Sequence, residues 1–255
     1  MEAKVQFKND HGENLVGNLH TPDRPMRYGV VLGHCFTCSR HTGILRQICQ
    51  DLTLAGCAAL RFDFSGNGQS EGLFEQSTYS KQISEMRSAI AFLRKQGVDR
   101  IGLAGHSMGA VVALLAAAEM HDVEAVCCLA GRLTGMDPSR FLTKEQQQEL
   151  QRSGRIHFTS RGRDLQLTRR FFSDTDQFDL PRIIRSLQTP LLIVHGDQDE
   201  IIPVDEAHRA YRLNSQYAKL EIIPAADHMF SSADQRRTIA AMIVQWFDKL
   251  LGHTV

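Results

Sequence analysis

Two kinds of hydrophobic pattern alternate along this chain. Five short runs are apolar without polar alternation, which is typical of strands buried on both faces of a parallel sheet. These runs cover residues 28–33, 58–64, 100–104, 123–129 and 190–194. Between them lie amphipathic stretches whose apolar residues fall at helical spacing, at 44–55, 79–96 and 108–120. Strand and helix therefore alternate, as in a doubly wound sheet.

The two ends of the chain complete this pattern differently. Residues 4–8 and 14–20 are two short predicted strands, and the turn between them contains Gly12, which predicts an antiparallel hairpin. Near the other end we expect a helix at 205–213, a strand at 219–223 and a helix at 234–251. The predicted fold class is α/β, with a mostly parallel doubly wound sheet and an N-terminal antiparallel hairpin.

Residues 131–185 interrupt the alternation. They show no clear strand, several polar runs and the pair Phe171-Phe172, and we interpret them as a small inserted cap. At 255 residues we expect a single domain, 1–255, with this insertion at about 131–185. The insertion has eleven Arg or Lys against seven acidic residues. We therefore consider that Arg169, Arg170, Phe171 and Phe172 bind substrate, against the alternative that these arginines are solvated helix faces.

Charge and composition exclude several classes of protein. Lys plus Arg equals Asp plus Glu at 29 each, so no overall positive field exists to concentrate nucleic acid. Residues 1–10 lack the apolar core of a signal peptide, and no apolar run is long enough to span a bilayer. We expect a cytoplasmic protein whose six cysteines are reduced. Cys35 and Cys38 form a C-x-x-C without a second Cys or His pair, so no metal site is expected.

A serine lies in a sequence context typical of a nucleophile. Gly105-His106-Ser107-Met108-Gly109 fits G-x-S-x-G directly after a predicted strand and before a predicted helix. On such a sharp turn the Ser107 hydroxyl is presented above the sheet, and the small glycines let the turn close. The Met108 N–H, at the helix N-terminus, would face the negative oxygen of a tetrahedral intermediate.

A second donor for that oxygen is expected from the loop after the run 28–33. The loop reads Gly33-His34-Cys35-Phe36-Thr37, and either Phe36 or Cys35 would supply the N–H. On its own this loop is equally consistent with an apolar turn in which His34 is packed.

Candidates for the base and the acid that a nucleophilic serine needs follow at the ends of later strands. A serine hydroxyl needs an imidazole to take its proton and a carboxylate to fix the tautomer of that imidazole. Asp197 and Asp199 both follow the run 190–194, and either can serve as the acid. His228 follows the predicted strand 219–223 and is the natural base. We interpret the adjacent Asp227 as a hydrogen-bond acceptor within its loop.

These motifs together resemble the α/β-hydrolase superfamily over almost the whole chain, and especially small bacterial carboxylesterases, including cinnamoyl (feruloyl) esterases. The matching segments are residues 61–70, the elbow 105–109, the loop 195–203 and the pair Asp227-His228. The resemblance implies that Asp199 is the triad acid and Phe36 the oxyanion donor. Relatives often have His-Gly where this chain has His34-Cys35. We also expect Cys35 to contact the substrate.

The resemblance implies a serine hydrolase that cleaves esters of small acyl or aryl-acyl groups, with no cofactor or metal. The expected partner is a small-molecule ester, not a nucleic acid, and the sequence does not indicate an oligomeric state. The alternatives are an acyltransferase, a thioesterase or a peptidase that uses the same three residues, or a non-catalytic binding protein on this scaffold.

Overall fold

A mixed sheet of eight strands forms the centre of the computed structural model, which describes residues 1–26 and 28–252. The strand order is β1-β2-β4-β3-β5-β6-β9-β10. β1 and β2 pair antiparallel, β2 pairs antiparallel with β4, and the other pairs are parallel. The predicted fold class and N-terminal hairpin are therefore confirmed. The bounds are β1 Glu2–Lys8, β2 Asn14–His20, β3 Gly29–Gly33, β4 Ala58–Phe62, β5 Ile101–His106, β6 Val123–Leu129, β9 Leu191–Gly196 and β10 Ala218–Ile223.

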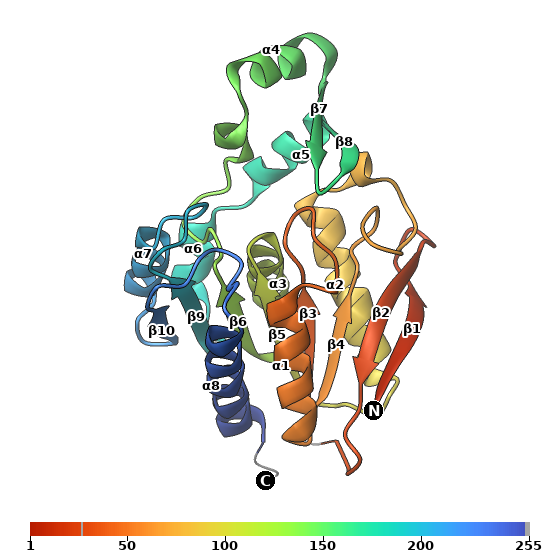
Figure 1. The fold of residues 1–255 in the computed structure, drawn as a ribbon, viewed down its shortest axis with the longest axis vertical. Coiled ribbons are helices and arrows are strands. Elements are labelled where there is room, and N and C mark those ends of the chain that lie inside the picture. Colours follow the sequence, from red (N-terminus) through yellow and green to blue (C-terminus); the bar gives the residue numbers. More distant parts are fainter. Residues whose placement is uncertain (27, 253–255) are drawn as a thin grey trace.

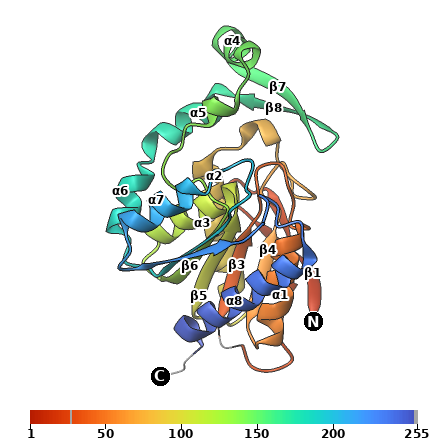
Figure 2. The ribbon, with the colours of Figure 1, turned by 60° about the vertical axis from the view of Figure 1, so that its left-hand side comes forward.

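Helices cover both faces of this sheet (Figures 1 and 2). On one face α1 packs beside α8, and alternate strand residues such as Val30 and Leu32 meet them in one apolar cluster. On the other face α2, α3, α6 and α7 share a second cluster with Val31. Successive side chains of β3 thus enter opposite cores, which explains its unbroken apolar sequence. The bounds are α1 Gly43–Leu54, α2 Tyr79–Arg94, α3 Met108–Glu119, α6 Leu180–Ser186, α7 Asp205–Leu213 and α8 Ala233–Leu251.

The helix α3 is the most deeply buried of these. Ten consecutive residues from Met108 are buried, because α3 packs against β3, β5 and β6 as well as α2. A helix enclosed on all sides needs no polar face. Its N-terminus is thereby held at the carboxyl end of β5, where Ser107 lies.

Residues 131–185 leave the sheet after β6 and return to it before β9. Figures 1 and 2 show that α4, β7, β8 and α5 lie beyond the end of the sheet, above α3. This segment comprises a 3₁₀ turn Pro138–Phe141, α4 Lys144–Ser153, β7 Arg155–Ser160, β8 Arg163–Thr168, α5 Arg169–Asp174, a 3₁₀ turn Thr175–Gln177 and α6. A further 3₁₀ turn, Phe74–Gln76, contacts β8 from the main body.

The expectation that this insertion has no strand is wrong, because β7 and β8 form an antiparallel hairpin. Its turn is Arg161-Gly162, with φ values of 53° and 72°, as in the tight turns that suit hairpins. Ile156 and Leu167 are the buried residues of the pair. The other hairpin residues are half-buried or exposed, so the apolar alternation is too weak to stand out in the sequence.

The expectation that all cysteines are reduced is also wrong, because Cys35 and Cys38 are joined as a disulfide. Their spacing places them in one tight turn after β3, with Cα atoms 5.2 Å apart, within the range that a disulfide spans. The other four cysteines are buried.

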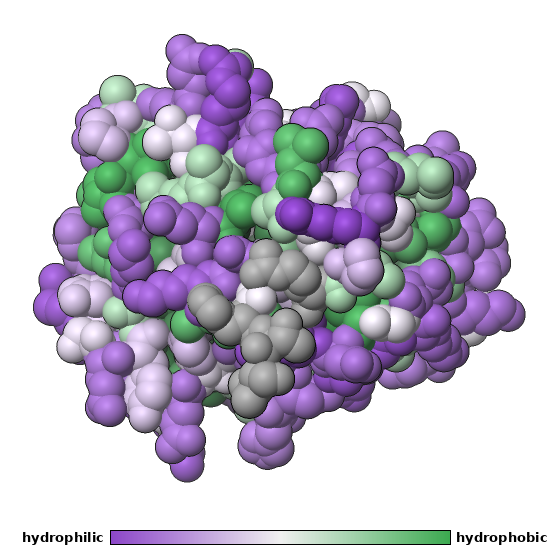
Figure 3. All heavy atoms as spheres, turned by 90° about the horizontal axis from the view of Figure 1, so that it is seen from below, coloured by the Kyte–Doolittle hydropathy of each residue, from purple (hydrophilic) through white to green (hydrophobic). Residues whose placement is uncertain are grey.

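The surface away from the insertion is mostly hydrophilic, with smaller apolar areas between the polar side chains (Figure 3). Among residues 1–26 and 28–252, no helix is long and apolar enough to cross a membrane.

Candidate active site

Ser107 lies between the end of β5 and the start of α3 in a strained conformation. Its φ of 57° and ψ of −115° lie outside the regions that L-residues prefer. The chain can turn this sharply because the residues two positions before and after Ser107 are glycines. A Cβ on Gly105 would lie 2.0 Å from the Gly109 carbonyl oxygen, and one on Gly109 would lie 2.3 Å from that of Gly33. The strain presents the Ser107 hydroxyl above the sheet.

His228 and Asp199 extend from Ser107 in a continuous chain of hydrogen bonds. His228 Nε2 lies 3.0 Å from Ser107 Oγ, and His228 Nδ1 lies 2.8 Å from Asp199 Oδ2. A carboxylate only accepts, so Nδ1 carries the proton and Nε2 is free to accept the serine proton. The three side chains come from loops after β5, β9 and β10, whose carboxyl ends meet at one edge of the sheet.

The Asp199 carboxylate is fully enclosed and bonded through both oxygens. Oδ1 accepts the backbone N–H groups of Ile201 and Ile202, at 2.9 and 2.8 Å. Oδ2 accepts from His228 and lies 3.2 Å from His195 Nε2. Burial alone would raise the pKa of Asp199, but hydrogen bonds from the two histidines and a backbone N–H hold it well below its usual range. Asp199 is therefore ionised wherever the protein is folded near neutral pH.

The neighbouring acids have other partners. Asp197 is exposed, and its Oδ1 accepts the Ala225 N–H at 2.7 Å. Asp227 Oδ1 accepts the Ser231 N–H at 2.9 Å, in agreement with its interpretation as a loop acceptor. Of the two candidate acids in the loop after β9, Asp199 is the one within hydrogen-bonding distance of His228.

Buried histidines brace this arrangement. His106 Nε2 lies 2.7 Å from the His228 carbonyl oxygen and donates to it, since a carbonyl only accepts. Burial and the neighbouring His228 lower the pKa of His106 to about 4, so it is neutral at physiological pH. His195 Nε2 donates to the Ile202 carbonyl at 2.8 Å while it faces Asp199. Each histidine thus fixes a segment that carries a member of the Ser107-His228-Asp199 chain.

Two backbone N–H groups are candidates to hold an oxyanion beside Ser107. Met108 begins α3, so its N–H is among those that a helix leaves without an internal partner. Phe36 and Met108 both line the cavity that contains Ser107. His34 Nδ1 donates to the Cys35 carbonyl at 2.7 Å and fixes the peptide that joins Cys35 to Phe36. Because that peptide is planar and trans, the same bond sets the direction of the Phe36 N–H.

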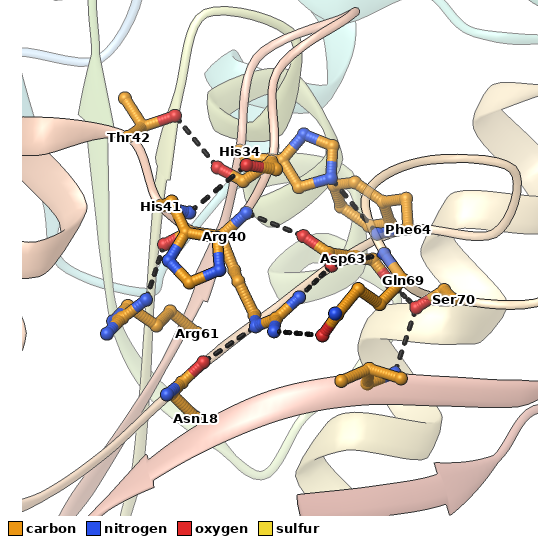
Figure 4. Close-up of polar contacts among 12 residues, drawn as sticks. Asn18, His34, Arg40, His41, Thr42, Arg61, Asp63, Phe64, Gln69 and Ser70 are labelled. Atoms are coloured by element: carbon orange, nitrogen blue, oxygen red, sulfur yellow. Dashed lines mark hydrogen bonds and ion pairs between the residues drawn. The ribbon is translucent and has the colours of Figure 1, made fainter. Parts of the chain in front are cut away.

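A buried ionic network supports the loop after β3 (Figure 4). His34 Nε2 accepts the Phe64 N–H at 3.0 Å. Arg40 forms an ion pair with Asp63, and its backbone N–H donates to the same carboxylate at 2.7 Å. Arg40 Nη2 also donates to Gln69 at 2.7 Å. The segment 61–70, which carried part of the family resemblance, thereby holds the loop of Phe36 in place.

A cavity of about 320 Å³ opens from Ser107 toward the insertion. Most of its lining is apolar, and it includes two of the predicted substrate contacts, Phe171 and Phe172. The Phe36 ring also lines the cavity, and its centroid lies 5.5 Å from the Phe171 ring centroid and 6.1 Å from the Phe158 ring centroid. The lining residues that belong to the insertion are Arg132, Gly135, Met136, Asp137, Pro138, Phe141, Leu142, Gln146, Ile156, Phe158, Leu167, Phe171 and Phe172.

The three other predicted substrate contacts do not line this cavity. Cys35 is buried in its disulfide with Cys38. Arg169 and Arg170 are exposed, and Arg169 donates to the carbonyl oxygens at the end of α4. They begin α5, whose next residues, Phe171 and Phe172, face the cavity instead.

Arg132 is the cationic side chain of the cavity lining, and the sequence analysis did not single it out. It follows the end of β6, next to the strand that carries Ser107. Its position just after a predicted strand could have identified it from the sequence, because side chains at the carboxyl ends of the central strands converge on the site.

Comparisons with known proteins agree with this architecture. The model of the alpha/beta hydrolase family matches residues 30–241. A monoacylglycerol lipase from Mycolicibacterium smegmatis is 22% identical, over 96% of each chain. The esterase domain of a Rhodothermus marinus protein has a TM-score of 0.78 and 25% identity, over 99% of this chain and 100% of that one. Est1E from Butyrivibrio proteoclasticus with bound ferulic acid has a TM-score of 0.83 and 23% identity, over 98% and 100%.

Proposed function

Since residues 30–241 match its model, this chain belongs to the α/β-hydrolase family, and on that premise we propose that it is a serine esterase. Its substrates are carboxylic esters of small acyl or aryl-acyl groups. The observation that carries the proposal is the hydrogen-bond chain from Ser107 through His228 to Asp199.

In this mechanism Ser107 Oγ attacks the ester carbonyl carbon while His228 Nε2 takes its proton. The Asp199 carboxylate stabilises the imidazolium that forms. The N–H groups of Met108 and Phe36 hold the negative oxygen of the tetrahedral intermediate. Collapse breaks the ester bond, and the alcohol leaves with the proton from His228. Water then attacks the acyl-serine by the same steps and releases the acid.

The cavity supports the choice of substrate class. Its walls are mainly aromatic and aliphatic, which suits an acyl or aryl-acyl group of modest size. In this proposal residues 131–185 act as the cap that closes over that group. The related lipase, the related esterase domain and the ferulic acid in Est1E are consistent with such esters.

A panel of substrates with one acyl group tests the proposal. Purified protein is assayed with p-nitrophenyl, methyl, thioester and amide derivatives of butyrate and of a hydroxycinnamate. We expect the oxygen esters to have the highest kcat/KM. A higher kcat/KM for the thioester or amide would instead indicate a thioesterase or a peptidase, and transfer to an added alcohol without free acid would indicate an acyltransferase. No turnover of any substrate by folded protein would indicate a binding protein.

A further inference from the structure

Arg132 lies in a part of the chain that is bent toward the nucleophile. After β6, Ala130 has a positive φ of 48°, and Gly131 packs so closely that an added Cβ would lie 2.9 Å from Ala110 Cβ in α3. The chain thus turns over the first helical turn beyond Ser107. Both Arg132 and Ser107 line the same cavity.

The guanidinium of Arg132 is held by one hydrogen bond and has a buried nitrogen that no described residue accepts from. Its Nε donates to the Gly135 carbonyl at 3.1 Å. Its Nη1 is buried without a hydrogen-bond partner among the residues that the structure describes. Across 1–26 and 28–252, Arg132 makes no ion pair within 4.0 Å. A buried donor on a charged group costs free energy when it is unmatched, so such a group favours a ligand that accepts from it.

The nearby carboxylates are occupied elsewhere. Glu206 Oε2 accepts the Thr134 N–H at 3.1 Å and the Thr134 hydroxyl at 2.5 Å. Asp137 Oδ1 accepts the backbone N–H and the hydroxyl of Ser139, at 2.9 and 2.5 Å. Burial and the nearby Arg140 lower the pKa of Arg132, while Glu206 and Asp137 act in the opposite direction. In the described part of the chain neither carboxylate forms an ion pair with Arg132.

Apart from Asp137, whose carboxylate accepts hydrogen bonds from Ser139, the rest of the cavity lining that the structure describes is mainly apolar and holds no second cation. Phe141 lies against the guanidinium, with its ring centroid 5.9 Å from Arg132 Cζ, and Met136 and Leu142 are neighbours in the lining. Tyr79, also in the lining, is a neutral phenol, and burial raises its pKa further, to about 12. The preferred ligand therefore combines an apolar chain or ring with one anionic acceptor.

We propose that Arg132 binds a carboxylate carried on the apolar acyl or alcohol part of the substrate and so selects half-esters of dicarboxylic acids and similar anionic esters. The identity of the substrate in this inference rests on the proposed esterase function. The anion-binding site itself does not depend on that function. Guanidinium and carboxylate match in a planar, two-bond geometry, which a neutral amide cannot reproduce with the same strength.

Arg140 provides a matched control. Its Cζ lies 5.5 Å from the same Phe141 ring, but Arg140 is exposed and does not line the cavity. Arg132→Gln and Arg140→Gln therefore remove the same charge from the same aromatic neighbour, and only the first removes it from the cavity.

The first experiment compares a p-nitrophenyl half-ester that has a terminal carboxylate with the ester of equal length that has a carboxamide there. In Arg132→Gln we expect KM for the carboxylate ester to rise roughly tenfold or more, since hydrogen bonds to charged groups are the stronger kind. KM for the carboxamide ester and both kcat values should change less than about twofold, because a binding contact away from the reacting atoms is lost. Arg140→Gln should change neither KM.

A second experiment needs no turnover. Binding of 4-phenylbutyrate and 4-phenylbutyramide to Ser107→Ala protein is measured by calorimetry, with and without Arg132→Gln. We expect the acid to bind more tightly than the amide, and Arg132→Gln to remove that preference. Arg132→Lys keeps a cation and should retain part of it, which separates charge recognition from damage to the loop.

The two experiments fail in different ways. If no ester is hydrolysed but the acid is preferred in an Arg132-dependent manner, the esterase proposal fails and the anion site stands. Equal affinity of acid and amide in Ser107→Ala protein, or equal loss of both in Arg132→Gln, would overturn the anion site and leave Arg132 a structural residue of its loop.

Discussion

The edge of the sheet around Ser107 and the insertion above it are built on different principles. At the sheet edge, the catalytic candidates are fixed by hydrogen bonds: the Asp199 side chain is completely enclosed and meets four donors. In the insertion, α4 contains no buried residue, and the inward side consists of packed aliphatic and aromatic side chains. Hydrogen bonds fix the positions of the bonded atoms to a few tenths of an ångström, whereas apolar packing fixes the shape and volume of a cavity.

This difference assigns different tasks to the two regions. In the proposed mechanism the reaction needs fixed directions between a nucleophile, a base and an acid, and those would come from the ends of β5, β9 and β10. Selection among substrates needs a cavity of a certain shape and charge, and residues 131–185 form most of the lining of the cavity beside Ser107. Changes at the sheet edge should therefore lower kcat, and changes in the insertion should mainly alter KM and substrate preference.

The largest expected effect is that of Ser107→Ala. We expect kcat to fall on the order of a millionfold, since the three groups act as a unit. The free energy of unfolding should change little, because Ser107 donates its side-chain hydroxyl only to His228 in the described part of the chain. Steady-state kinetics with a p-nitrophenyl ester and urea denaturation measure the two quantities. A kcat within tenfold of wild type would show that another residue is the nucleophile.

Asp199→Asn comes next, with an expected fall in kcat of roughly 10⁴-fold, because an amide favours the wrong tautomer of His228. The matched control is Asp197→Asn in the same loop, which removes an exposed carboxylate that bonds to Ala225 instead. Its kcat should stay within about tenfold of wild type on the same substrate. The reverse ranking of the two variants would show that Asp197 is the acid.

The buried histidines of the sheet edge predict a pH dependence of stability. The pKa of His106 in the folded protein is about 4, below its ordinary value of about 6.5, so the unfolded chain takes up the proton first. The contribution of His106 is fully present above about pH 6.5 and is lost as the pH falls toward 4, with a slope of at most about 1.4 kcal/mol per pH unit.

Urea denaturation of wild type and His106→Gln between pH 7 and pH 4 measures this slope. The free energy of unfolding should decrease less steeply with falling pH in the variant. Parallel curves would mean that His106 does not stay neutral when the protein folds.

The smallest effect is expected in the insertion. Phe158 lies in β7 and its ring stacks on that of Phe36 at an interplanar angle of 11°. Phe158→Ala should raise KM for an aryl-acyl ester about tenfold, the order expected when an aromatic contact is lost, and leave kcat within about threefold. Kinetics with aryl-acyl and acetyl esters of one alcohol check this, with the acetyl ester as control. A loss confined to kcat would contradict the prediction that changes in the insertion mainly alter KM.

The same division decides what the sequence predicts. Strand-helix alternation and the elbow 105–109 were readable because buried parallel strands need unbroken apolar runs and the turn at Ser107 needs glycines. The residue pattern alone does not decide whether Asp197 or Asp199 is the acid, since both follow β9. Only the path of the loop brings one of them to His228. The family resemblance favoured Asp199, which lies beside His228 in the structure, and its role as the acid stays a prediction.

The insertion was less predictable because its contacts are made between segments far apart in sequence. The hairpin of β7 and β8 packs its few apolar residues against Phe74 and Phe171, so its own pattern is weak. Likewise, Arg169 and Arg170 look like Arg132 in a charge count, and only the fold turns Arg132 toward the cavity and the others toward solvent.

The central claim is that the hydrogen-bond chain to His228 makes Ser107 the activated hydroxyl of this protein, and reaction with a fluorophosphonate followed by peptide mass spectrometry tests it most directly. The account predicts one label per chain, on Ser107, with labelling abolished in Ser107→Ala and strongly slowed in His228→Ala. Labelling of another serine, or no labelling of folded protein, would contradict it.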